Sequence, residues 1–340
     1  MLIEVSAGTH RSFMVVPDDR GMSPRTRPAD APAFVTFLLA PVVGELLSSS
    51  APLPGFLVVW LPLALLYGCG VLIVRELAVR WGSGWWGIAL LGAAYGIVEE
   101  GLVTRAFFDP AWEDLGALAT FGRDGGINWL WALQLTVFHA AISVGVTLLF
   151  VRILFPHRWE EPWLSRRGMG WCFVGIAAWL AAGFAAYRPG AEPLVLTVAV
   201  VALFVAAARF VPSPRRRRGP APRPRRVFAT AFTAAAVVML GPYLLAEVPA
   251  AHPLLAAALI VGVVAAMVGR GSRWPGEGWG DRHRLALASG ELGFFLVIAP
   301  IVSGSPWIAV TSLAAGLVLH RRARRLRIRE AGIGVEEVTG

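Results

Sequence analysis

The sequence has 340 residues, of which 56% are hydrophobic and 16% are charged, and its mean hydropathy is +0.62. This is too much apolar surface and too little charge for a water-soluble domain. The formal net charge is +9, but the basic residues are divided among short segments between apolar runs. That distribution is typical of membrane topology and not of a nucleic-acid-binding surface, so no nucleic-acid partner is predicted.

The N-terminal segment is polar and lacks the apolar core of a cleavable signal peptide. Residues 1–32 are therefore predicted to be a cytoplasmic segment, and the first membrane helix is expected to remain as an anchor. Cys69 and Cys172 both fall inside apolar runs, where a thiol behaves as a small hydrophobic group. No disulfide or CxxC metal framework is predicted.

Apolar runs separated by turn residues predict an all-α, polytopic membrane protein with about ten transmembrane helices. The expected ranges are 33–50, 55–78, 85–107, 129–154, 169–187, 192–211, 227–246, 253–269, 285–303 and 306–320. Residues 33–211 would hold the first six helices and residues 227–320 the last four. An Arg/Pro-rich cytoplasmic linker, 212–226, would separate them, and a basic and then acidic cytoplasmic tail, 321–340, would follow.

The arginine distribution predicts the orientation, because basic residues near helix ends favour the cytoplasmic side. With the N-terminus in the cytoplasm, 28 of the 31 arginines lie in cytoplasmic segments, and only Arg105, Arg123 and Arg188 lie outside. Both ends of the chain are therefore predicted to be cytoplasmic. We expect a multi-pass protein of the cell membrane, and specifically of the cytoplasmic membrane of a bacterium.

Two connecting segments stand out by composition. Residues 213–226 are rich in Pro and Arg, so we expect a flexible linker that is attracted to the anionic headgroups of membrane lipids, or one that only fixes the topology. Residues 108–128 form the longest external connection and carry four acidic residues. This loop would either cap a site from the outer side or be an ordinary solvated loop.

Ionisable groups at membrane depth cost from about 3 kcal/mol upward, so each one is a candidate functional residue. Counting along the predicted spans places Glu45, Glu99, Glu100 and His139 slightly to the outer side of the midplane. Glu291 would lie near the midplane.

The spacing of these residues indicates which way they point. Gly92, Gly96 and Glu100 recur every four residues, so Glu100 should face a closely packed helix and not lipid. Tyr95 lies one turn from Glu99, and His139 shares a helix face with Ser143. Two further polar residues mark the outer end of the His139 helix: Asn128 and Gln134.

Two carboxylates held together in a low dielectric cannot both stay ionised cheaply, so one of them would serve as a general base or a proton carrier. The imidazole of His139 would supply the complementary group. The alternative is that these side chains only tie helices together by hydrogen bonds.

The stretch YGIVEEGLVTRAFF, residues 95–108, resembles the EExxxR motif of the CAAX protease and bacteriocin-processing family of intramembrane proteases. In that family, glutamate and histidine residues are held to activate a water for peptide cleavage. The resemblance covers about residues 60–155 and implies that Glu99 and Glu100 are the paired glutamates and His139 the first histidine. Arg105 is one place late for the arginine of the motif.

The sequence departs from the family pattern at several places. Leu135 stands at the phenylalanine of FxxxH, and Ser143 stands where an HxxxN motif has asparagine. No second histidine lies in the interior of a predicted span, since His157, His252, His283 and His320 lie in loops or at span ends. The resemblance therefore implies a remote relative, active or inactive.

Two functions and one non-functional alternative remain open. The first is an intramembrane protease with Glu99 or Glu100 as base and His139 as partner of the water or the oxyanion. The second is a transporter or proton-coupled permease that uses the same carboxylates, and the third is a helical scaffold without a site. The sequence specifies no substrate or cofactor, and it shows too few ligands to predict a metal.

Overall fold

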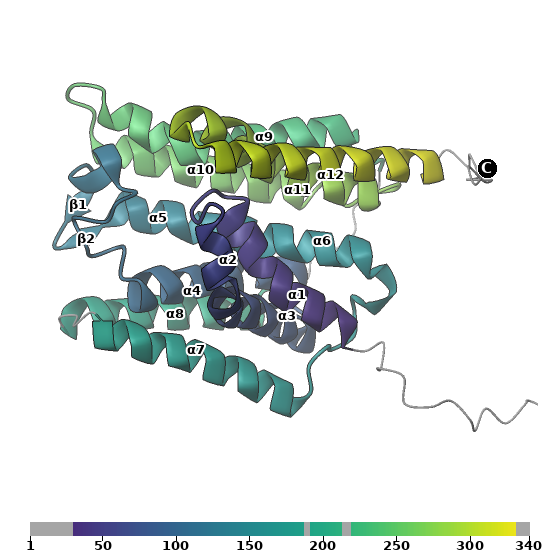
Figure 1. Cartoon of the computed structure of the whole chain (residues 1–340), viewed down its shortest axis with the longest axis horizontal. Helices are drawn as coiled ribbons and strands as arrows, with labels where there is room; N and C mark the ends of the chain where they lie inside the picture. Colours follow the sequence, from purple (N-terminus) through teal and green to yellow (C-terminus); the bar gives the residue numbers. More distant parts are fainter. Residues whose placement is uncertain (1–29, 187–190, 213–218, 331–340) are drawn as a thin grey trace, which may run out of the picture.

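The computed structural model describes residues 30–186, 191–212 and 219–330. Within these residues the chain is almost entirely helical, and most helices run along one common direction (Figure 1). Several predicted features lie outside the described residues: most of the N-terminal segment 1–32, Arg188, the part of the linker at 213–218 and the end of the tail at 331–340.

Eight helices of the described chain are long and apolar enough to cross a membrane. They are Gly55–Trp81, Gly84–Val103, Trp129–Leu154, Arg166–Ala186, Pro193–Phe210, Pro224–Ala246, Pro253–Gly271 and Asp281–Ser303. A shorter apolar helix, Ala31–Leu46, precedes them, and the helix Pro306–Glu330 follows. The prediction of a polytopic helical membrane protein is confirmed.

The first four membrane helices along the chain, which begin with Ala31–Leu46, are not uniform α-helices, because each contains a π-helical segment. We call each of these four interrupted helices a rod. The first rod is α1 (Ala31–Pro41) and η1 (Val42–Leu46), and the second is α2 (Gly55–Leu63), η2 (Ala64–Gly68) and α3 (Cys69–Trp81). The third is α4 (Gly84–Val98) and η3 (Glu99–Val103), and the fourth is α5 (Trp129–Phe138), η5 (His139–Val146) and α6 (Thr147–Leu154). Pro41 and Pro62, which cannot donate a backbone hydrogen bond, precede η1 and η2.

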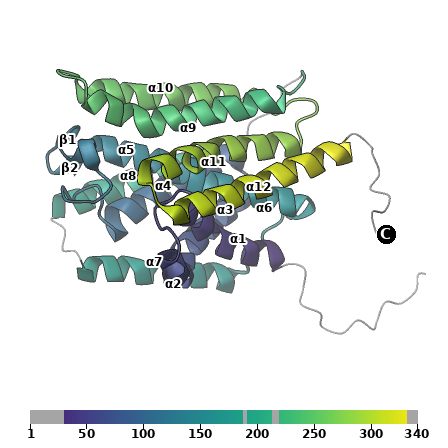
Figure 2. The same cartoon turned by 45° about the horizontal axis from the view of Figure 1, so that its top comes forward.

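The remaining helices are regular and more peripheral: α7 (Arg166–Ala186), α8 (Ala191–Phe210), α9 (Pro224–Ala246), α10 (Pro253–Gly271), α11 (Asp281–Ser303) and α12 (Pro306–Glu330). In Figure 2, α9 and α10 form an outer layer over α11. On the opposite side, α7 lies beside α3, and α8 lies beside α4.

Short elements complete the connections. The loop between η3 and α5 holds a turn of 3-10 helix, η4 (Gly116–Ala119), and a small antiparallel hairpin of β1 (Arg123–Asp124) and β2 (Ile127–Asn128). A second 3-10 turn, η6 (Pro156–Arg158), follows α6. The start of α1 and the end of α12 lie at the same end of the bundle (Figure 1), as the predicted orientation requires.

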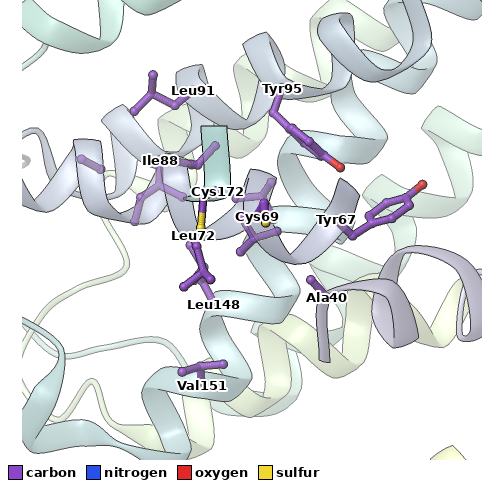
Figure 3. Close-up of a cluster of buried hydrophobic side chains, with 14 of the residues drawn as sticks. Ala40, Tyr67, Cys69, Leu72, Ile88, Leu91, Tyr95, Leu148, Val151 and Cys172 are labelled. Carbon is purple, nitrogen blue, oxygen red and sulfur yellow. The ribbon is translucent and has the colours of Figure 1, made fainter. Parts of the chain in front are cut away.

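Apolar side chains from α1, α3, α4 and α6 form the main core, which Figure 3 shows. Cys69 and Cys172 are free thiols within this cluster. Tyr67 and Tyr95 lie at its edge, and Figure 3 shows both hydroxyls pointing away from the apolar side chains.

A buried ion pair closes the inner end of this core. Arg75 and Glu76 are both fully buried, and their side chains meet at 2.7 Å. Arg75 also donates to the Trp159 carbonyl, and its guanidinium lies 3.6 Å from the centre of the Trp163 ring. Glu76 accepts a 2.7 Å hydrogen bond from the Trp163 backbone. The pair therefore anchors the segment that follows α6.

The end of the predicted linker is structured and not flexible. Ala221 donates to the Glu277 carbonyl at 2.9 Å, and Glu277 donates to the Gly219 carbonyl at 2.9 Å. The helix α9 begins at Pro224, three residues before the predicted start. Proline suits this first turn because its missing N–H has no partner there. At the C-terminus, α12 continues as a helix through the basic part of the predicted tail to Glu330.

Candidate functional site

One group of polar side chains meets inside the first four rods. We call it the polar cluster: Glu45, Tyr67, Tyr95, Glu99, Glu100, His139 and Ser143. Glu45 comes from η1, Tyr67 from η2, the two adjacent glutamates from η3, and His139 and Ser143 from η5. Each π-helical segment in the described part of the chain thus contributes to the cluster. Such segments are frequent at functional sites because the wider turn redirects side chains.

His139 lies at the centre of the polar cluster. Its Nε2 atom is 3.0 Å from Oε1 of Glu100, and its Nδ1 atom is 3.1 Å from Oγ of Ser143. Nδ1 also lies 3.4 Å from Oε2 of Glu99, which is longer than an ordinary hydrogen bond. The imidazole is thus placed between two carboxylates, and it is 1% exposed. A protonated ring would interact favourably with both glutamates.

The two glutamates have different surroundings. The side chain of Glu99 is 2% exposed, whereas that of Glu100 is 12% exposed and accepts a 3.0 Å hydrogen bond from the Thr104 hydroxyl. Oε2 of Glu99 and the hydroxyl of Tyr95 are buried without a hydrogen-bond partner of ordinary geometry. Buried polar atoms are almost always satisfied by protein or water, so the cluster has hydrogen-bonding capacity for a small polar ligand.

Glu45 joins the polar cluster through Tyr67, whose hydroxyl donates a 2.8 Å hydrogen bond to Oε1 of Glu45. The Tyr67 ring is stacked on the His139 ring, with centroids 6.1 Å apart. Tyr95 meets the same imidazole edge to face at 6.0 Å. Two tyrosines therefore form the walls of the histidine pocket and fix the position of the ring.

Small residues make room for these rings. A Cβ atom at Gly96 would lie 2.6 Å from Cβ of His139, and one at Gly44 would lie 2.6 Å from the Tyr67 ring. A Cβ at Gly70 would overlap the Tyr95 ring. Gly92 faces the backbone of Ala140. Glycines on α3, α4 and η1 thus allow the backbones to approach closely enough to bring the polar side chains together.

The donor set is also suited to a metal ion. One oxygen each from Glu99 and Glu100 and one nitrogen of His139 lie within 4.8 Å of one another. Three protein ligands of these types are what a catalytic metal site uses, with water in the open position. In the described arrangement the same atoms are engaged with each other, so a bound ion would replace those contacts.

Three of the predicted supporting residues lie outside the polar cluster. Gln134 donates to the carbonyls of Val238 and Met239, both at 2.9 Å, and so joins α5 to α9. Pro242 cannot donate to the Val238 carbonyl in the helical pattern, and Gln134 satisfies that acceptor instead. The role of Gln134 is therefore to pack two helices against each other.

Asn128 and Arg105 belong to the connection of residues 104–128 between η3 and α5. Asn128 caps α5 by accepting from the Trp131 backbone at 3.0 Å, and it donates to the Leu118 carbonyl at 2.5 Å. Arg105 follows the end of η3 with a positive φ of 64°, and its guanidinium is 5.8 Å from the Phe108 ring centre. Glu291 lies on α11, outside the elements that form the cluster.

The connection of residues 104–128 forms a cap with buried apolar side chains, while its acidic residues Glu113, Asp114 and Asp124 are exposed. Ala106, Phe107, Leu115 and Leu118 are buried, and they pack with residues of α5, α8 and α9. The Arg123 side chain donates to four backbone carbonyls of the same connection. This cap covers the end of η3 next to the polar cluster.

Sequence reasoning missed Tyr67 as part of the cluster, because a tyrosine within an apolar run reads as ordinary core. The sequence feature that could have indicated this tyrosine is a pair of glycines, Gly44 and Gly70, near the midplane of two separate predicted spans. Both glycines leave space for aromatic rings. Only the packing of the helices shows that these spaces are filled by Tyr67 and Tyr95.

A scan of family models matches residues 34–270 to an uncharacterised membrane protein family. The chain belongs to this family. The matched range contains all residues of the polar cluster, while α11 and α12 lie entirely beyond it. A search of curated proteins and a search of solved structures each gave no match.

The family description assigns no activity to its members. The resemblance to the CAAX protease and bacteriocin-processing family consequently stays a prediction. Function has to be inferred from the polar cluster itself.

Proposed function

We propose that this membrane protein is an intramembrane hydrolase, a protease in the simplest case, whose reaction takes place at the polar cluster. One observation carries the proposal: the His139 imidazole lies between Glu99 and Glu100, with Nε2 3.0 Å from one carboxylate and Nδ1 3.4 Å from the other. Paired carboxylates with an imidazole, enclosed away from bulk water, are suited to general acid–base catalysis.

The geometry suggests a separate task for each residue. Glu100 is the more accessible carboxylate and would take a proton from the attacking water. His139 is held by Ser143 and the two tyrosine rings and would return a proton to the leaving group. Glu99, which is almost fully buried, would stabilise the positive charge on the imidazole. A glutamate pair that differs in exposure fits this division of labour.

The test uses the purified protein in lipid nanodiscs with a panel of membrane-anchored fluorogenic peptides. Glu100→Gln and His139→Ala should each lower turnover by about 10²-fold or more, and the double variant should be little worse than either single one. Glu291→Gln is the matched control, since it makes the same chemical change outside the cluster. Equal losses in Glu100→Gln and Glu291→Gln would contradict the proposal.

A proton-coupled carrier is the second candidate, and the hydrogen bond between Tyr67 and Glu45 favours it. That bond extends the polar cluster to a third carboxylate on another helix, as a proton path would need. Reconstituted vesicles would distinguish the two functions. Substrate-driven proton flux without peptide cleavage would support the carrier, and cleavage without flux would support the hydrolase.

The predicted orientation decides which side of the membrane the polar cluster faces. We place the protein in the cell membrane with the cap at residues 104–128 outside and the 272–280 turn in the cytoplasm. In a variant with Cys69 and Cys172 replaced, an impermeant thiol reagent should label Glu113→Cys in intact cells and leave Glu277→Cys unlabelled. Both side chains are exposed, so accessibility does not bias the comparison. The opposite labelling would reverse the orientation.

A further inference from the structure

A groove runs between α9, α11 and α12, away from the polar cluster. Its first part is a hollow of about 420 Å³ with mostly apolar walls. A second hollow, also of about 420 Å³, shares Leu296, Val297 and Gly316 with the first and extends along α11 to Pro300. The groove is open beside Gly316 on α12, where a Cβ atom would meet nothing within 4 Å, whereas Gly293 on α11 lines the groove close to the Phe228 and Phe232 rings of α9.

One end of the groove is basic. Arg225 in the first turn of α9, Arg282 in the first turn of α11 and Arg327 in the last turn of α12 all line the first hollow. His320 lines it as well. The nearby carboxylate of Asp281 is paired with Arg284 at 2.6 Å. The end of the groove therefore carries a concentration of positive charge.

The other end of the groove, away from the arginines, is lined by apolar side chains and lies on the outer surface of the helix bundle. Val297 on α11 is 51% exposed, and Leu317 and Val318 on α12 are 48% and 64% exposed. In a polytopic membrane protein these side chains contact lipid chains. A ligand in this groove would consequently enter from the bilayer.

The dimensions fit a lipid. The first hollow runs along α11 from Arg282 to Val297, fifteen residues or about 22 Å at 1.5 Å per residue. One leaflet contributes about 15 Å of hydrocarbon, half of a core about 30 Å thick, and the headgroup adds the remainder. The basic end then lies at headgroup level, and Gly293 and Gly316 lie at the level of the acyl chains.

We propose that this groove binds one anionic phospholipid, with its phosphate between Arg225, Arg282 and Arg327 and an acyl chain along α11 and α12. Guanidinium groups bind phosphate by paired, charge-assisted hydrogen bonds, and clustered arginines favour anionic over zwitterionic lipids. A second copy of the chain fits less well, because a symmetric contact would bring two arginine-rich α12 helices together. The site is independent of the proposed hydrolase activity, since it shares no residue with the polar cluster.

The test is native mass spectrometry of the full chain in mixed micelles that contain dioleoyl phosphatidylglycerol or dioleoyl phosphatidylcholine. The double variant Arg225→Gln/Arg327→Gln should lower the occupancy of the tightest phosphatidylglycerol site at least fivefold. The matched control is Arg226→Gln/Arg329→Gln, which removes the same charge from the same two helices at exposed residues outside the groove. It should leave that occupancy unchanged.

A second pair of variants tests the apolar part. Gly316→Leu should fill the groove and abolish tight binding, whereas Gly262→Leu on α10 should not, although a Cβ meets open space at both glycines. If both arginine double variants lost the same phosphatidylglycerol occupancy, the lipid would be held by a diffuse electrostatic attraction and not by the groove, and the proposal would be overturned. Equal binding of phosphatidylcholine, or a dimer that Gly316→Leu disrupts, would do the same. Melting temperatures without added lipid verify that each variant is folded.

Discussion

Two regions of the protein differ in how much of their helix surface is buried within the protein. The first region runs from Ala31 to Leu154, and the second comprises α7 to α12. In the first region, 72% of the most apolar 18-residue stretch of Gly84–Val103 is buried within the protein. In the second region, only 11% of the corresponding stretch is buried in Pro193–Phe210 and in Pro253–Gly271. Nearly all buried polar side chains of the described chain lie in the first region, and so do its π-helical segments. The second region is made of helices that are apolar on most sides.

The difference shows where a membrane protein can hold polar chemistry. Hydrocarbon cannot satisfy a carboxylate or an imidazole, so helices that carry them must be surrounded by other helices. Helices without such groups can face lipid at no comparable cost. The outer helices thus shield the polar cluster, and in α11 and α12 they also supply the lipid-facing groove.

Removal of the buried cation should have the largest effect on stability. Arg75→Ala removes the fully buried cation beside Glu76 and leaves only Arg80, 3.2 Å away and partly exposed, as an ion-pair partner, so it should lower the free energy of unfolding by about 3 kcal/mol. The matched change in the outer region, Arg270→Ala, removes an exposed side chain and should stay within about 0.5 kcal/mol. Titration with SDS in mixed micelles measures both values. Equal effects would mean that the two regions do not differ in this way.

A small residue at a helix contact gives a finer comparison. Gly96→Ala would place a Cβ 2.6 Å from Cβ of His139 and should cost about 1–3 kcal/mol through overpacking. Gly262→Ala meets open space on α10 and should be neutral or slightly stabilising. The same titration measures both. If Gly96→Ala were as well tolerated as Gly262→Ala, the close approach of α4 and η5 would be wrong.

The smallest effect is expected where the two regions meet in the cap of residues 104–128. Tyr243 of α9 donates to the Asp114 carbonyl at 3.0 Å. Partial desolvation, with a further contribution from Glu113, raises the pKa of the Asp114 carboxyl, although the residue stays exposed at the surface. The stability that this group contributes is therefore full below the ordinary pKa of aspartate and is lost as the pH rises through the raised value.

Asp114→Asn should remove this pH dependence and slightly raise the melting temperature at neutral pH. Melting curves of both proteins from acidic to neutral pH measure the difference, and Asp124→Asn in the β-hairpin of the cap is the control. Parallel curves for the wild type and Asp114→Asn would show that the Asp114 carboxyl remains solvated in the cap.

The sequence by itself determined the class of the protein and much of its helix arrangement. Long apolar runs give the membrane spans because length and hydropathy are local properties of the chain. The four-residue spacing of Gly92, Gly96 and Glu100 also placed that glutamate on a protein-facing side, where the structure has it. The burial of Arg75 and Glu76 could not be recognised from the sequence, because it depends on the distant segment 159–163 that covers them.

Only the tertiary structure decided which polar residues act together. Gln134 and Ser143 both lie on the His139 helix, yet Ser143 contacts His139 while Gln134 turns to α9. Each π-helical segment changes the direction in which the following side chains of its rod point. Tyr67 also lies on a different rod from His139, about 70 positions earlier in the chain. Side-chain direction after such a turn, and contact between distant helices, depend on packing and not on local sequence. That is the physical reason why the sequence could combine Glu99 and Glu100 with His139 in one site but could not add Tyr67 to it or separate Gln134 from it.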